Sequence, residues 1–145
     1  MRPLTAVALF CEDIRQEKAG TDSIVGIMPD NAEVGKIPGT FPKIAIYIRI
    51  QMDPTADPGP ISLELRMPNG EIQPGGAFAP EVVAKSLADT REQKSPIASL
   101  ILRSIVVNLT VKAPGRILAV LKHGKEETLC GFLNILGPPN PAPTA

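Results

Sequence analysis

The chain has 145 residues, a length typical of one domain with its own hydrophobic core. Its 15 basic and 15 acidic side chains cancel, so it lacks the positive field that attracts nucleic acids and anionic membranes. It has no Trp, one Tyr and four Phe, so Ile, Leu and Val must supply the core. We therefore predict a single domain over residues 1–136, with no nucleic-acid partner and no membrane partner.

The first apolar segment, residues 4–11, has apolar side chains on both sides of an extended chain, which predicts a well-covered strand. The run starts too near Met1 and ends in the charged segment 12–17, which does not match a signal peptide. No segment approaches the roughly 20 apolar residues of a membrane helix. These features predict a cytoplasmic protein.

Three further strands are expected over residues 23–28, 43–52 and 61–67. The second alternates most regularly, with Ile44, Ile46, Ile48 and Ile50 on one side of the chain. Residues 29–42 and 54–60 are rich in Pro, Gly and Asp and read as loops. A tight turn is expected at Asn69-Gly70.

The segment 71–96 allows two interpretations. Gln73-Pro74-Gly75-Gly76 is expected to break any strand. Residues 80–93 fit a short helix that begins at Pro80 and places Val83 and Leu87 one turn apart. The alternative is an edge strand over residues 81–87.

The last part of the chain predicts three strands. In residues 97–111, Ile105, Val107 and Leu109 are expected on the buried side and Ser104 and Asn108 on the other. A turn at 114–115 leads to a strand over 116–121, and a turn at 123–124 leads to a strand over 128–135. Residues 137–145 predict a disordered proline-rich tail.

Seven or eight short strands with at most one short helix, near residues 80–93, predict an all-β, antiparallel β-sandwich. A small barrel is the alternative.

Three segments carry a resemblance to a known family: LFCEDIRQE at 9–17, SIVGI at 23–27 and PGR at 114–116. With these segments in this order, the chain resembles the small bacterial proteins of the domain of unknown function 6941 family over most of residues 1–136. The resemblance implies an immunoglobulin-like sandwich in a cytoplasmic bacterial or phage-related setting. It implies no catalytic or ligand-binding residues.

Few residues suggest chemistry. His123 is the only histidine and is expected to be a solvated turn residue beside Gly124. Cys11 and Cys130 could pair if the first and last strands are neighbours, but buried free thiols are expected in a chain without an export signal. We therefore predict that the protein is not an enzyme.

A metal site has weak candidates in the loop carboxylates, because sandwich loops can assemble calcium sites. The four candidates are Asp13, Asp22, Asp30 and Asp53. No loop places several acids at the short spacing of known calcium loops, and the glycine-rich segments lack the context of a phosphate loop. We predict no cofactor.

The sequence thus predicts a non-enzymatic protein-interaction or assembly module that binds a protein partner or forms a homo-oligomer. Tyr47 and Arg49, on the polar side of the most regular strand, are residue types enriched at interface hot spots. The alternative is a metal-ion or small-ligand binder that uses loops at one end of the sandwich.

Overall fold

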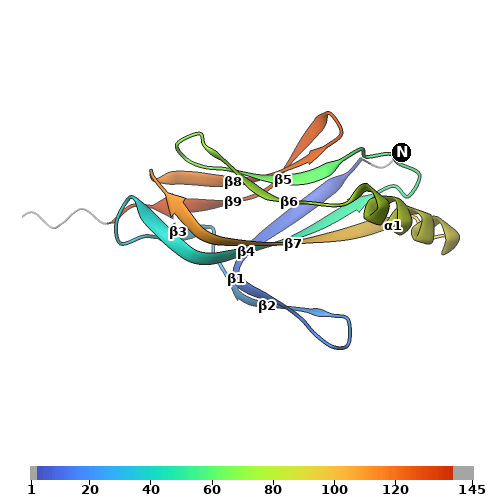
Figure 1. Cartoon of the computed structure of the whole chain (residues 1–145), viewed down its shortest axis with the longest axis horizontal. Coiled ribbons are helices and arrows are strands. Elements are labelled where there is room, and N and C mark those ends of the chain that lie inside the picture. The colour runs from blue at the N-terminus through green and yellow to red at the C-terminus, as the bar shows by residue number, and fades with distance from the viewer. Residues whose placement is uncertain (1–2, 139–145) are drawn as a thin grey trace, which may run out of the picture.

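A computed structural model describes residues 3–138 of the chain, which form two β-sheets and one helix (Figure 1). The elements are β1 (Thr5–Gln16), β2 (Asp22–Ile27), β3 (Asn31–Glu33), β4 (Gly39–Met52), β5 (Ile61–Arg66), β6 (Ile72–Ala77), α1 (Pro80–Glu92), β7 (Ala98–Val111), β8 (Gly115–His123) and β9 (Glu126–Leu136). The predicted all-β antiparallel sandwich is confirmed.

The first sheet has the order β2-β1-β4-β7 and the second has the order β3-β9-β8-β5-β6. The longest ladder joins β4 to β7, from Gly39 opposite Val111 to Met52 opposite Ala98. All pairs are antiparallel except β3 with β9. The hairpin of β2 and the second half of β1 extends away from the two packed sheets (Figure 1).

The core lies between the two sheets and is aliphatic. Alternate residues of β4 point into it, and Ile44, Ile46, Ile48 and Ile50 are fully buried. They pack in one cluster with side chains from β5 and β8, such as Leu65. Each buried side chain of this size contributes about 1.5–3 kcal/mol relative to an exposed one.

The two sheets also approach each other at their margins. The first half of β1 lies beside β9 without being its hydrogen-bonded neighbour in either sheet. A Cβ added to Gly131 of β9 would stand 3.0 Å from the carbonyl oxygen of Ala8 in β1. We call this contact between β1 and β9 the seam. On the other margin β6 lies beside β7.

Helix α1 confirms the helix interpretation of residues 80–93 and excludes the edge strand over 81–87. Pro80 occupies its first turn, and Val83 and Leu87 are its buried residues. No helix in the described part of the chain is both long enough and apolar enough to cross a membrane.

The predicted strand count is too low, because residues 3–138 contain nine strands. The sequence missed β3, which is three residues long, and β6, which contains Pro74, Gly75 and Gly76. β6 is an edge strand that pairs only with β5, so a proline there removes no essential ladder hydrogen bond. Residues 1–2 and 139–145 lie outside the described residues, and the predicted disordered tail falls largely on the second of these segments.

The predicted faces of β7 are wrong in its middle. Ser104 is buried, whereas Ile105 and Val107 are exposed. Asn108 has a φ of 54° and both it and Val107 are exposed, so the alternation of faces changes there. Leu109 is buried as predicted because it follows this change.

Candidate functional site

Four exposed apolar side chains lie along the seam: Val7 and Leu9 of β1, and Leu129 and Phe132 of β9. We call them the seam patch. Their exposed fractions are 62%, 36%, 58% and 37%. The sequence predicted a covered strand for residues 4–11, and this is wrong for the side that carries Val7.

The backbone explains why these four side chains share one surface. Ala8 and Gly131 meet across the seam, and the patch residues neighbour them in the chain. Leu4 and Glu126 line one pocket farther along the seam, so β1 and β9 run in the same direction. This direction places Val7 and Leu9 on the β1 side of the seam and Leu129 and Phe132 on the β9 side, in the same order along it. A register shift between Ala119 and Val120 in the β8–β9 ladder marks a bulge, which leaves Cys130 unpaired between Leu129 and Gly131.

Polar residues flank the seam patch on both sides. On β4, Arg49 is the register partner of Val7, and Tyr47 is the register partner of Leu9. The structure therefore brings the two predicted interaction residues next to the patch, with Arg49 exposed and Tyr47 half-buried. On β8, the guanidinium carbon of Arg116 lies 5.0 Å from the centre of the Phe132 ring, a cation–π distance.

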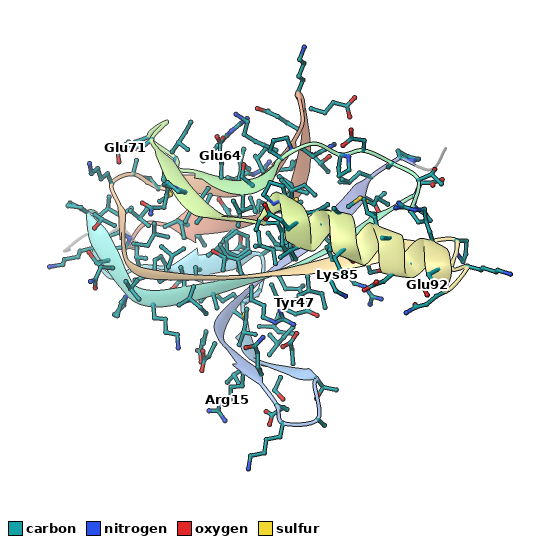
Figure 2. All side chains as sticks on the ribbon, turned by 45° about the vertical axis from the view of Figure 1, so that its right-hand side comes forward. Arg15, Tyr47, Glu64, Glu71, Lys85 and Glu92 are labelled. Atoms are coloured by element: carbon teal, nitrogen blue, oxygen red, sulfur yellow. The ribbon has the colours of Figure 1, made fainter. Side chains whose placement is uncertain are left out.

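The second sheet carries a charged network that reaches β9, the strand at the seam, through Glu127. Nη2 of Arg66 donates a hydrogen bond to Oε1 of Glu127 at 2.7 Å and lies 3.6 Å from Oε2 of Glu64. The other oxygen of Glu64, Oε1, lies 3.5 Å from Nζ of Lys122. In Figure 2, Glu64 lies on the sheet opposite to the one that carries Tyr47, and Arg15 lies on the projecting hairpin. The Glu127 contact raises the pKa of Arg66 and lowers the pKa of Glu127. Each charged group of this network is therefore paired with an opposite charge inside the network.

The four candidate metal ligands lie in separate places. Asp13 accepts a hydrogen bond from Lys43 at 2.7 Å, and Asp22 accepts two from Arg103. Asp53 accepts hydrogen bonds from the backbone and hydroxyl of Thr55, and Asp30 precedes β3. Within residues 3–138, no three His, Cys, Asp or Glu side chains are placed to hold one metal ion.

His123 is a buried residue, so the prediction of a solvated turn residue is wrong. The two turn residues are Gly124, whose φ is 62°, and Lys125, and His123 is the last residue of β8, only 8% exposed. Its Nε2 lies 2.8 Å from Oγ1 of Thr128, and its Nδ1 lies 4.0 Å from a carboxylate oxygen of Glu126. It lines a pocket of about 390 Å³ together with Met52, Pro58 and Lys125.

Cys11 and Cys130 are both buried free thiols. The Cys11 thiol donates to the carbonyl of Ala45, and the Cys130 thiol donates to the carbonyl of Thr128. Burial is the largest cause that raises the pKa of each thiol, and the charge of Asp13 raises that of Cys11 further. Neither thiol is placed as a nucleophile.

Comparisons with family models, curated proteins and solved structures found no match. The family resemblance, and the immunoglobulin-like sandwich and bacterial cytoplasmic setting that it implies, stay predictions.

Proposed function

We propose that this protein is a non-enzymatic interaction module that binds another protein through the seam patch. The observation that carries the proposal is the placement of four exposed large apolar side chains from two strands at one seam. Clustered apolar side chains in a polar surround are typical of protein-binding surfaces, whereas single exposed ones need no explanation. Tyr47 and Arg49 border the patch and add two residue types that are frequent at hot spots.

The described residues offer weak support for catalysis. The buried thiols have raised pKa values, and the one histidine hydrogen-bonds a threonine hydroxyl. The carboxylates with the closest contacts are paired with arginine or lysine. Binding therefore explains the arrangement better than a reaction does.

The test is affinity capture from the native lysate with two matched variants. Val7→Glu places a charge in the seam patch. Val107→Glu changes the same residue type at nearly the same exposure, 63% against 62%, but on β7. We expect a stoichiometric partner to be captured by the wild type and by Val107→Glu and to be lost with Val7→Glu. A folded wild-type protein that captures nothing, or equal loss with both variants, would contradict the proposal.

A second candidate function, small-ligand binding, is favoured by two pockets at one end of the sandwich. The pocket beside His123 has a volume of about 390 Å³, and a second of about 380 Å³ lies between residues 56–60 and α1. Loops at a sandwich end are common places for ligands. Amide chemical-shift changes around Lys125 and Arg91, induced by a metabolite panel and absent with Lys125→Ala or Arg91→Ala, would support it. No shift with any compound would count against it.

A further inference from the structure

We propose that the partner of the seam patch is a protein segment that presents aliphatic or aromatic side chains between carboxylates, and is not a second copy of this chain. This inference rests on the proposed function and specifies the chemistry of the partner. It is carried by the charges that flank the patch.

The apolar part of the surface sets the first requirement for the partner. Val7 and Leu9 line the β1 side of the seam, Leu129 and Phe132 line the β9 side, and all four side chains are exposed. Removing these side chains from water lowers the free energy when they contact apolar atoms instead. The partner must therefore present apolar side chains of its own.

The flanking charges set the second requirement. Along the surface the strands follow the order β8, β9, β1, β4, with Arg116 on β8 and Arg49 on β4. Both arginines are exposed, and neither forms an ion pair with another residue of 3–138. The seam patch thus lies between two cationic groups whose charge is not neutralised within this part of the chain.

The chemistry of arginine indicates carboxylates as their partners. The guanidinium group donates its hydrogen bonds in its own plane and fits a carboxylate with two parallel bonds. The guanidinium carbon of Arg116 lies 5.0 Å from the centre of the Phe132 ring, and the group forms no ion pair within residues 3–138. Its N–H groups can therefore donate to a carboxylate of the partner.

A second copy of the chain does not meet the second requirement. Because both flanks of the patch carry an arginine, two aligned patches would set arginine against arginine in either direction. Like charges that face each other across an interface disfavour that pairing. The same feature favours a partner with acidic side chains on both sides of its apolar residues.

The probes are two sets of synthetic peptides that carry the same Leu and Phe residues. One set has Glu on both sides of them, and the other has Lys. Binding is followed by amide chemical shifts of the ¹⁵N-labelled full-length protein at low ionic strength. We expect the Glu peptides to shift the amides of Val7, Leu9 and Phe132 and to bind about three- to tenfold more tightly than the Lys peptides.

Charge reversal gives the decisive comparison. The double variant Arg49→Glu/Arg116→Glu should reverse the preference toward the Lys peptides, whereas Val107→Glu should leave it unchanged. Circular dichroism verifies that each variant is folded. The preference for Glu peptides should also fall as salt rises, because the ion pairs are exposed.

Three results would overturn the inference: no binding by either set at millimolar peptide, equal binding of both sets, or a dimer in sedimentation that Val7→Glu abolishes. If lysate capture still depends on Val7 in those cases, the proposed function stands and only the partner chemistry is wrong. Loss of Val7-dependent capture would instead remove the proposed function itself.

Discussion

Arg103 on β7 donates two hydrogen bonds to the carboxylate of Asp22 on β2, at 2.9 Å from Nε and 2.8 Å from Nη2. β2 and β7 are the two edge strands of the same sheet, so this contact joins the projecting hairpin to the opposite margin. The Asp22 carboxylate is the largest cause that raises the pKa of Arg103. The ion pair is therefore a tertiary link that fixes the position of the hairpin.

Replacing Asp22 with Asn should loosen the hairpin. The charge-assisted bonds to Arg103 weaken while the shape of the side chain is kept, and we expect a loss of about 1–2 kcal/mol in the free energy of unfolding. Hydrogen exchange of β2 amides should accelerate more than that of β8 amides. Lys85→Ala breaks an exposed pair with Asp89 within α1 and serves as the control that leaves stability unchanged. Equal exchange rates in the variant and the wild type would contradict the link.

A side chain at Gly131 should be costly, because its added Cβ would stand 3.0 Å from the carbonyl oxygen and 3.4 Å from the Cβ of Ala8, so β1 would have to shift. Gly131→Ala should push β1 and β9 apart and lower the free energy of unfolding by about 1–3 kcal/mol. Gly35→Ala is the matched control, since nothing lies within 4 Å of its added Cβ. Chemical denaturation of the three proteins measures the difference. A Gly131→Ala protein as stable as Gly35→Ala would mean that the seam is not tightly packed.

Acid should destabilise the protein partly through Asp13. The hydrogen bond from Lys43 holds the pKa of Asp13 below its ordinary value of 3.8. A carboxylate whose pKa is lowered by folding stabilises the native state above the unfolded-state pKa, and this contribution is lost as the pH falls through the folded-state pKa. Asp13→Asn should therefore lose less thermal stability between pH 6 and pH 2.5 than the wild type does. Lys43→Gln should have the same effect, and the double variant should add nothing further.

The two cysteines should be unreactive in the native protein. Burial raises the pKa of both thiols, so little thiolate is present at neutral pH. We expect a thiol-specific reagent at pH 8 to label neither Cys11 nor Cys130 until denaturant is added. Val107→Cys, at a position that is 63% exposed, should react at once and is the positive control. Rapid labelling of the native wild type would show that the strands open frequently.

The sequence predicts the fold class well because the strongest signal, alternation in β4, comes from four fully buried isoleucines. It fails where the phase of a strand depends on one backbone conformation. Asn108 takes a left-handed conformation that reverses the faces of β7; Asn adopts this conformation more readily than most residues, but the apolar alternation does not mark the change. The predicted turn at 123–124 lies one residue too early. His123 is instead the last residue of β8, and a shift of one residue along a strand moves a side chain from the outer face to the inner face.

The seam patch could not be predicted in the same way. The sequence does place Val7 and Leu9 on one side of their strand, and Tyr47 and Arg49 on the outer side of β4. That Leu129 and Phe132 lie across the seam from them depends on the packing of β1 against β9, which are separated by more than a hundred residues of chain. The clearest sequence signal is Gly131, a glycine within a strand, which often marks close approach of another backbone.

The long β4–β7 ladder also has a consequence for how the chain folds. Its nearest paired residues, Met52 and Ala98, are separated by all of β5, β6 and α1. The β4–β7 ladder therefore forms only after the chain between Met52 and Ala98 brings its two ends together, and the entropy of closing this loop must be lost before the ladder contributes any stability. Folding dominated by such distant pairings takes about milliseconds to seconds. During that interval β4 can pair only with β1, so the edge of β4 that faces β7 stays unpaired until β7 has left the ribosome.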